Sequence, residues 1–430
     1  MSDDNVPKSG DWPVDPQDEQ EILKERIWVD GCFDFAHHGH AGALLQARQL
    51  GKELYVGIHS DEEILENKGP TVMTLCEREA AVDACRWSTK SIPHAPYVTS
   101  LPWISHYGCW YVVHGDDITS DASGEDCYRY VKAAQRFLVV KRTPGISTTD
   151  LVGRMLLCTK GHFIRSLSDE LAGVSDGKSD PERVAQGAAM LQRIKDYATD
   201  ETALQPGSEV WTWGPRSQAN TANKTHDSGF FEKLVSGNGP KPGQRIVYVD
   251  GGFDLFSSGH IEFLKRVNEA EKGEAYIVAG VHNDAVINHW KGLNYPIMNI
   301  FERGLCVLQC RYVHAIIFGA PFSPSKPYLE AIPLGQVSAV YHGPTAFMPS
   351  TYDPYTDAKD MGILREIEPH PYANVNAGEI VQRIMKGRQA FEERQRRKGE
   401  KAVGEEATRQ REIMEQEQAA IEEERRAALN

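Results

Sequence analysis

The stretch that decides the fold is Ile27-Trp-Val-Asp-Gly-Cys-Phe-Asp-Phe-Ala-His37-His-Gly-His40. The β-branched and aromatic run 27–29 predicts a buried strand, and residues 41–50 have the apolar spacing of a helix. A tight turn between them carries two histidines, with Gly39 where the backbone must approach another group closely. Free N–H groups at a helix start, the helix dipole and imidazoles together favour an anion, so the turn predicts a phosphate site. The alternative is a capped helix start with two surface histidines.

A second copy of this stretch argues against that alternative. Ile246-Val-Tyr-Val-Asp-Gly-Gly-Phe-Asp-Leu-Phe-Ser-Ser-Gly-His260 repeats it in register, Asp30 matching Asp250 and His40 matching His260. Shorter matches follow in the same order: Lys68-Gly69 with Lys291-Gly292, Glu77-Arg78 with Glu302-Arg303, Cys85-Arg86-Trp87 with Cys310-Arg311-Tyr312, Ala95-Pro96-Tyr97 with Ala320-Pro321-Phe322, and His114-Gly115 with His342-Gly343. The chain therefore contains a duplicated domain.

Composition narrows the class of protein. A chain of 430 residues with 40% hydrophobic and 25% charged residues is typical of a globular protein of two or three domains. The net charge of −14 argues against a general nucleic-acid binder. We find no signal peptide and no apolar stretch of membrane-spanning length, and none of the 8 cysteines forms a Cys-x-x-Cys pair. We therefore expect a cytoplasmic protein in which Cys306 and Cys310 are core residues.

The order of predicted elements indicates an α/β fold. In residues 25–172 predicted strands (54–58, 110–113, 137–140) alternate with predicted helices (74–84, 128–134, 148–155). This alternation predicts a parallel sheet, in which ligands bind at the carboxyl ends of the strands. We expect a second domain over residues 244–378.

The remaining segments are predicted to be irregular or extended. We expect residues 1–24 to be a disordered N-terminus, and residues 173–243 to be a linker with short helices at 183–197 and 229–235. Residues 379–430 predict a charged helical tail. We favour a solvated helix over a lipid-binding one, because the apolar face is weak and lacks aromatic residues beyond residue 395.

Three further segments of the first half add groups that suit a nucleotide. Lys68 lies in the loop Asn67-Lys-Gly-Pro70, although a lysine in such a loop is often an ordinary surface residue. His114-Gly-Asp-Asp117 ends a strand with acceptors for a base or ribose, although it is also compatible with a simple turn. Arg142-Thr-Pro-Gly-Ile-Ser-Thr-Thr-Asp150 offers a guanidinium, hydroxyls and free amides at a helix start, a combination that fits a polyphosphate.

Two of these motifs resemble a known family. Gly-x-Phe-Asp-x-x-His-x-Gly-His and Arg-Thr-x-Gly-Ile-Ser-Thr-Thr are similar to the motifs of the cytidylyltransferases in the nucleotidyltransferase superfamily. The tandem arrangement, His114-Gly-Asp-Asp117 and Tyr295-Pro-Ile-Met-Asn299 resemble the ethanolamine-phosphate branch of that family. The resemblance covers about residues 26–165 and 245–390. It implies two tandem Rossmann-like domains, with the first catalytic, and transfer of CMP from CTP to phosphoethanolamine with release of pyrophosphate.

The resemblance also suggests roles for individual residues. The catalytic residues would be His37, His40, Lys68 and Arg142. CTP would be bound by Cys32, Phe33, His37, His40, His114, Gly115, Asp116, Asp117, Arg142, Ile146, Ser147, Thr148 and Thr149. Phosphoethanolamine would be bound by Asp34, Lys68, Tyr97 and Tyr128. We expect Mg²⁺ to enter with CTP and to have no dedicated protein ligands.

The second half departs from the motifs. Ser257 replaces the first histidine, and Ala373-Asn-Val-Asn-Ala-Gly378 replaces the hydroxyl-rich loop, so we expect this half to fold without catalysing. It would pack on the first as a pseudo-dimer, with weak nucleotide binding through His260, Lys291 and His342 left open. A homodimer and weak peripheral membrane contact also stay open. So do glycerol 3-phosphate or phosphocholine as acceptor, and a regulatory nucleotide binder without catalysis.

Overall fold

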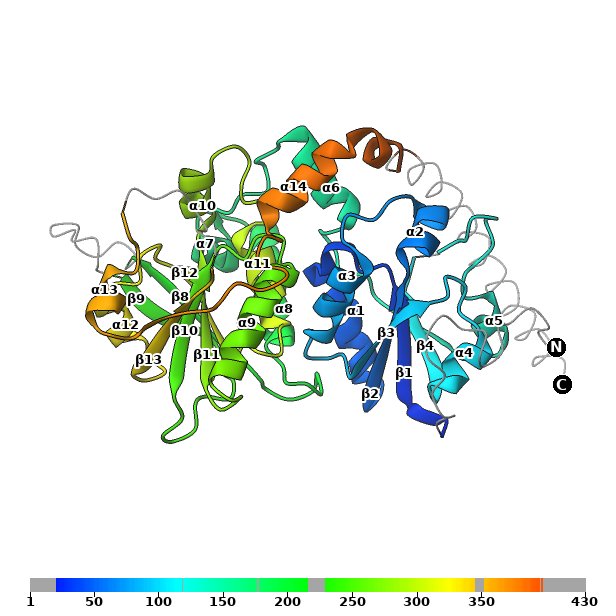
Figure 1. Ribbon diagram of the computed structural model, residues 1–430, viewed down its shortest axis with the longest axis horizontal. Helices are drawn as coiled ribbons and strands as arrows, with labels where there is room; N and C mark the ends of the chain where they lie inside the picture. Colours follow the sequence, from blue (N-terminus) through cyan, green and yellow to red (C-terminus); the bar gives the residue numbers. More distant parts are fainter. Residues whose placement is uncertain are drawn as a thin grey trace.

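The computed structural model describes residues 21–117, 119–175, 178–215, 229–344, 352–394 and 396. Two α/β halves lie side by side, the first built on a parallel sheet and the second on a mostly parallel one (Figure 1). The structure thus confirms the predicted tandem α/β architecture. In the described part of the chain, no helix has both the length and the apolar character needed to cross a membrane.

The first half contains a five-stranded sheet in which every strand is parallel, with the order β3-β2-β1-β4-β5. Its strands are β1 (Leu23–Gly31), β2 (Glu53–His59), β3 (Lys90–Ala95), β4 (Cys109–Gly115) and β5 (Phe137–Val140). Its helices are η1 (Asp34–Ala36), α1 (His38–Gln49), α2 (Asp61–Lys68), α3 (Leu75–Asp83), α4 (Leu101–His106), α5 (Arg129–Ala133) and α6 (Thr148–Leu157). Strand β3 was missed because Pro93 and His94 interrupt its apolar pattern.

The order of the strands indicates where in the first half a ligand can bind. The chain moves outward from β1 to β2 and β3, and then returns to the other side of β1 for β4 and β5. The direction of winding therefore reverses between β1 and β4, where the loops that follow the two strands separate and leave a crevice. Strand β1 fills the centre of this sheet because residues 27–29 are fully or almost fully buried, as their apolar run predicts.

The second half repeats this topology and extends it. Its sheet has the order β14-β13-β10-β11-β12-β8-β9, and its first five strands match β5-β4-β1-β2-β3. The strands are β10 (Ile246–Gly251), β11 (Tyr276–His282), β12 (Ala315–Ala320), β13 (Val337–His342) and β14 (Leu364–Glu366). The helices are α9 (Ser258–Ala270), α10 (Asp284–Lys291), α11 (Ile300–Leu308), α12 (Lys326–Ala331), α13 (Thr356–Asp360) and α14 (Ala377–Lys386).

The segment predicted to be a linker contributes to the second half. Directly after α7 (Leu167–Ala172), it contains the short hairpin β6 (Val174–Ser175) and β7 (Lys178–Ser179), α8 (Pro181–Tyr197), β8 (Glu209–Pro215) and β9 (Gly229–Val235). Strand β8 pairs in parallel with β12, and β9 pairs antiparallel with β8. The predicted helix at 183–197 is confirmed as α8, but the predicted helix at 229–235 is wrong, because this segment is β9. Residues 229–235 lie beside the edge strand β8, and pairing with β8 satisfies their backbone N–H and C=O groups. The residues themselves do not show that this edge is nearby.

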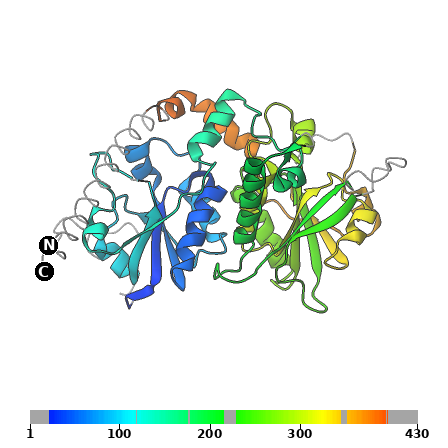
Figure 2. The ribbon, with the colours of Figure 1, turned by 180° about the vertical axis from the view of Figure 1, so that it is seen from behind.

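Helix α8 fastens the two halves together at their junction, where Figure 2 shows it from behind. The Tyr197 hydroxyl at its end donates a hydrogen bond to the carbonyl of His38 in α1. Just beyond the helix, the carbonyl of Asp200 accepts a hydrogen bond of 3.1 Å from the Trp87 indole. Helix α8 also packs against α11 and β9, so it joins the first half to the second.

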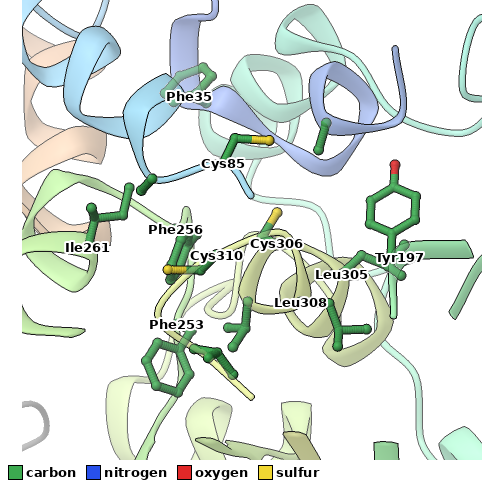
Figure 3. Close-up of a cluster of buried hydrophobic side chains, with 14 of the residues drawn as sticks. Phe35, Cys85, Tyr197, Phe253, Phe256, Ile261, Leu305, Cys306, Leu308 and Cys310 are labelled. Atoms are coloured by element: carbon green, nitrogen blue, oxygen red, sulfur yellow. The ribbon is translucent and has the colours of Figure 1, made fainter. Parts of the chain in front are cut away.

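The two halves share a hydrophobic core at their contact (Figure 3). Phe35 and Cys85 of the first half face Phe256, Cys306 and Cys310 of the second. The expectation that Cys306 and Cys310 are core residues is confirmed, since neither is exposed.

The backbone at the centre of this contact has approximate two-fold symmetry. Cys85 and Cys310 form an isolated antiparallel bridge. The N–H of Arg86 donates to Gln309 O at 2.8 Å, and that of Arg311 donates to Ala84 O at 2.9 Å. These are matched positions of the repeat, so the two halves form the expected intramolecular pseudo-dimer.

The terminal predictions fall mostly outside the described residues. Strand β1 already begins at Leu23, so it includes the last two residues of the segment predicted to be disordered, and residues 1–20 are not described. Helix α14 starts at Ala377 and is followed by helical residues 388–394. The predicted charged tail beyond residue 396 lies outside the described residues.

Candidate active site

The turn after β1 has a strained backbone. Phe33, Phe35 and Ala36 have φ values of 56°, 65° and 39°, a left-handed region that side chains other than glycine rarely adopt. Phe33 and Phe35 are buried, and their packing compensates for part of this strain. Strain of this kind gathers at functional sites because the surrounding structure must enforce it. Here it delivers the chain from the end of β1 directly into the N-terminus of α1.

His37 and His40 lie together at that helix start. His37 is the N-cap of α1, and its Nδ1 accepts the N–H of Gly39 at 3.1 Å. When Nδ1 accepts, the neutral ring carries its proton on Nε2, which is then a donor suited to a phosphate oxygen. The rings of His37 and His40 stack with their centroids 3.9 Å apart. The predicted pair of imidazoles therefore forms one unit.

A cavity of about 330 Å³ opens above this helix start. Both histidines line it, together with Lys68, Arg142 and Thr148. These groups come from three places: the turn after β1 with the first residues of α1, the last residue of α2, and the segment from the end of β5 to the start of α6. A phosphate site at this turn requires the imidazoles to face the Arg142 loop. They do so, because both histidines and Arg142 line the same cavity.

The loop after β5 packs directly on the turn that carries the histidines. A Cβ on Gly39 would lie 2.8 Å from Ile146 Cγ2, which explains why a glycine stands there. The Ser147 hydroxyl caps α6 by accepting the N–H of Asp150 at 3.0 Å. Two helix N-termini, of α1 and α6, thus meet at one cavity, and both favour bound anions.

The end of β4 contributes a neutral histidine to the cavity. Burial lowers the pKa of His114, and the carboxylates of Asp117 and Asp30 oppose this shift without reversing it. Its Nδ1 lies 3.2 Å from the carbonyl of Gly115 and donates to it, since a carbonyl can only accept. The ring of Tyr128 lies beside it, with centroids 4.7 Å apart.

Asp30 is the centre of a buried hydrogen-bond network at the floor of the cavity. Its Oδ2 accepts from the Trp28 indole at 2.7 Å and from the Thr99 hydroxyl at 2.5 Å, and its Oδ1 accepts from the Tyr128 hydroxyl at 2.7 Å. Burial, followed by the charge of Asp30, raises the pKa of Tyr128 well above its ordinary value. Tyr128 therefore stays protonated and fixes the position of the carboxylate.

Most of the predicted residues line the cavity, and three do not. Those that do are Cys32, Phe33, Asp34, His37, His40, Lys68, His114, Gly115, Asp117, Arg142, Ile146, Ser147, Thr148 and Thr149. Asp116 lies behind Arg142, whose N–H donates to Asp116 Oδ1 at 3.3 Å. Tyr97 lies under Lys68, with Nζ 5.5 Å from the ring centroid, and Tyr128 lies behind His114.

Asp34 differs from the expectation in its contacts. Its buried carboxylate accepts the backbone N–H groups of Val72 and Met73, at 3.0 and 2.9 Å. It therefore pins the loop that follows Lys68 to the turn after β1. Recognition of an ammonium by Asp34 remains a prediction, and the position of Asp30 makes Asp30 a stronger candidate.

The sequence reading missed several lining residues. Asp30, Asn67, Thr119, Ser120 and Thr143 belong to the first half. The end of β1 pointed to Asp30, because a polar residue that closes a buried strand lies at the edge where ligands bind. Phe391 and Arg394 also line the cavity, although they follow the second half in the chain, and no local pattern pointed to them.

The second half has a larger cavity of about 630 Å³ at the matching place, lined by His260, Lys291 and His342. The start of α9, which corresponds to the phosphate-binding start of α1, differs from it. Ser257 Oγ donates to the carbonyl of Val375 at 2.7 Å, and a Cβ on Gly259 would lie 2.3 Å from the same oxygen. A carbonyl oxygen thus lies at the N-terminus of α9, where it disfavours a phosphate.

Comparison with known proteins agrees with this geometry. The family described as Cytidylyltransferase-like matches residues 28–154. Ethanolamine-phosphate cytidylyltransferase from Mus musculus is 41% identical over 393 residues, which cover 90% of this chain and 92% of that protein. The protein of the same name from Dictyostelium discoideum is 38% identical over 385 residues, covering 88% and 95%.

A related enzyme matches a smaller share. Choline-phosphate cytidylyltransferase 2 from Arabidopsis thaliana is 37% identical over 180 residues, which cover 41% of this chain and 59% of that protein. The first two relatives match across both halves and nearly their full length. The chain therefore belongs to the ethanolamine-phosphate cytidylyltransferase family.

Proposed function

We propose that this protein transfers the cytidylyl group of CTP to phosphoethanolamine, and so forms CDP-ethanolamine for phosphatidylethanolamine synthesis. An oxygen of the phosphoethanolamine phosphate attacks the α-phosphorus of CTP. The bond between that phosphorus and the oxygen bridging to the β-phosphate breaks, and pyrophosphate leaves. The nucleophile is already anionic, so the protein has to align the reactants and offset the charge on the five-coordinate phosphorus.

One observation carries the proposal: the imidazoles of His37 and His40 share a cavity with Lys68 and with Arg142. In this site the two imidazoles hold the α- and β-phosphates at the start of α1. The Arg142 loop, with Ser147, Thr148 and Thr149, holds the rest of the triphosphate. Lys68 holds the phosphate of the acceptor.

The nucleoside and the amine take the remaining parts of the cavity. The backbone of Cys32 and Phe33 and the segment 114–117 hold the cytidine. The ammonium of phosphoethanolamine meets the carboxylate of Asp30, which Tyr128 orients, with Tyr97 and Asp34 completing the surroundings. A carboxylate buried among aromatic rings favours a small cation by charge and by cation–π attraction.

Magnesium would enter with CTP. Among the described residues, no group of three or more His, Cys, Asp or Glu side chains is arranged to hold a metal ion. Phosphate oxygens and water would then supply the ligands that Mg²⁺ prefers. The ion would reduce the negative charge of the triphosphate.

The second half would serve as a folded partner of the first, without turnover of its own. We further propose that the protein is located in the cytoplasm. There the whole chain would form a homodimer and make weak peripheral contact with membranes. Residual nucleotide binding by His260, Lys291 and His342 belongs here too, because these side chains line the second cavity.

The test is the release of pyrophosphate by the purified protein in the presence of Mg²⁺ and CTP. Phosphoethanolamine, phosphocholine and glycerol 3-phosphate are offered separately at equal concentrations. The proposal expects turnover with phosphoethanolamine and a kcat/KM at least about tenfold lower with the other two, because each lacks the primary ammonium that Asp30 would pair with. Preferred turnover of another acceptor would refute the substrate, and CTP binding without turnover would favour a regulatory nucleotide binder.

A further inference from the structure

The C-terminal end of the second half crosses back to the first. Helix α14 lies at the top of the junction between the halves, next to α6 (Figure 1). The same neighbours meet when the molecule is seen from behind (Figure 2). Arg383 of α14 holds Glu77 of α3 with two hydrogen bonds, of 2.7 and 2.9 Å. The second half is therefore anchored beside the loop that closes one side of the first-half cavity.

Beyond α14 the chain continues over that cavity. Residues 388–394 are helical, Phe391 is buried, and both Phe391 and Arg394 line the cavity. Arg394 Nη1 donates to the carbonyl of Pro70 at 2.5 Å and lies 3.4 Å from Asp34 Oδ2. A Cβ on Gly69 would be 3.4 Å from the Arg394 side chain, so the aliphatic part of this side chain packs on the loop directly after Lys68.

The position of Arg394 identifies which phosphate it faces. The loop that it contacts follows α2, which follows β2, whereas the Arg142 loop follows β5. In the sheet order β3-β2-β1-β4-β5, these two loops lie on opposite sides of β1 and its histidines. Arg394 therefore lies at the Lys68 end of the cavity, where the proposed function places the acceptor phosphate, and not at the triphosphate end.

Because the reactants are negatively charged, positively charged side chains at the Lys68 end of the cavity would favour their binding. Both the acceptor and CTP are anions, and the chain itself has a net charge of −14. Among the described residues that line the cavity, the lysine and arginine side chains are those of Lys68, Arg142 and Arg394. A guanidinium has five N–H donors, more than the contacts with Pro70 and Asp34 use, and its fork matches two phosphate oxygens.

We infer that Arg394 is a binding residue for the phosphate of phosphoethanolamine, brought to the first-half site by the C-terminal segment of the second half. This inference rests on the proposed function. It also gives the second half a task in the reaction. The second half lacks the first histidine and the hydroxyl-rich loop of the motifs, and the segment after its last helix, α14, supplies an arginine to the half that has them.

The test compares three variants of the full chain with wild type: Arg394→Ala, Arg394→Lys and, as a matched control, Arg388→Ala. Arg388 lies on the same segment, but its side chain is 52% exposed and pairs with Glu392. For each protein, KM is measured for phosphoethanolamine at saturating CTP and for CTP at saturating phosphoethanolamine. Calorimetry gives the Kd of phosphoethanolamine, and thermal unfolding confirms that each variant is folded.

Arg394→Ala is expected to raise the KM and Kd for phosphoethanolamine about 10- to 100-fold, the usual effect of losing a hydrogen-bonded charge. The KM for CTP should change less than about threefold. Arg394→Lys should recover part of the loss because it keeps the charge without the fork, and Arg388→Ala should match wild type.

Two outcomes overturn the inference while leaving the proposed function intact. In the first, wild type is active and Arg394→Ala leaves the KM and Kd for phosphoethanolamine within about twofold. In the second, Arg394→Ala raises both KM values equally, which would mean that Arg394 supports the cavity as a whole. Wild type that neither turns over nor binds phosphoethanolamine overturns the proposed function and this assignment with it.

Discussion

Arg383 and Glu77 are 306 residues apart in the chain and form a two-pronged ion pair between the halves. Burial by itself raises the pKa of Glu77, but the hydrogen bonds from Arg383 and Thr74, together with the charge of Arg383, outweigh burial, so that the pKa lies below its usual value. Arg154 and Glu302 form the matching pair in the opposite direction, at 2.8 and 2.9 Å. Each half thus contributes one helix whose arginine binds a glutamate of the other half, so the two ion pairs are reciprocal.

The first prediction concerns the imidazole pair. His37→Ala or His40→Ala should lower kcat/KM about 10²- to 10³-fold, as expected for losing a donor aimed at charge that develops in the transition state. Steady-state release of pyrophosphate measures this effect, and the unfolding temperature should change little. Ser257→Ala, at the matching position of the second half, serves as the control and should keep nearly wild-type turnover. A His40→Ala protein with full activity would refute the site.

The second prediction concerns the ion pair between Arg154 and Glu302, whose side chains are 10% and 7% exposed. Arg154→Met should lower the free energy of unfolding by about 3 kcal/mol, because the buried Glu302 carboxylate loses its partner. Lys52→Met is the control, since the pair of Lys52 with Glu25 is exposed and should contribute no more than about 1 kcal/mol. Denaturant unfolding measures both, and equal losses would contradict the prediction.

In the double variant Arg154→Met with Glu302→Gln, part of the loss should return. The neutral amide leaves no buried charge without a partner, although it weakens the cap that Glu302 provides to Asn299. Simple addition of the two single effects would mean that the side chains act independently.

The third prediction concerns the core shared by the halves. Leu305 is fully buried in the cluster of Figure 3, and Leu305→Ala should cost about 2–5 kcal/mol of stability through lost transfer energy and the cavity left behind. Leu204→Ala removes the same atoms from a side chain that is 64% exposed, and it should cost less than about 0.5 kcal/mol. Chemical denaturation distinguishes the two, and similar losses would show that the contact between the halves contributes little.

The fourth prediction is a pH dependence of stability that depends on His314. Its Nδ1 accepts the N–H of Ile277 at 3.1 Å, and burial, followed by the charge of Arg86, lowers its pKa to about 4. The unfolded chain takes up this proton near pH 6.5, before the folded protein does. The stability is therefore present above about pH 6.5 and declines by about 1.4 kcal/mol per pH unit as the pH falls toward 4.

His314→Asn keeps an acceptor near the Ile277 N–H and removes the titrating group. The difference in unfolding free energy between wild type and variant should therefore shrink as the pH is lowered from 7 to 4. Parallel curves over that range would show that His314 does not carry the effect.

Local sequence patterns were sufficient for most of the first half. The apolar run 27–29 predicted a buried strand, and these residues are fully or almost fully buried in β1. Segment 142–150 predicted a helix start, and α6 begins there with Ser147 as its cap. The histidines and the Arg142 loop met in one cavity because parallel strands bring their carboxyl ends to one edge. Strand β9 was misread because its pairing partner, and not its own residues, decided its conformation.

The sequence by itself therefore determined the repeated α/β unit, the phosphate-binding turn and the loss of that turn's groups in the second half, because these depend on neighbouring residues. Only the tertiary structure decided that Asp34 would be engaged by the amides of Val72 and Met73, and that Arg394 would reach a cavity built 360 residues earlier in the chain. Contacts over such separations depend on how two halves pack, and no local periodicity encodes that packing.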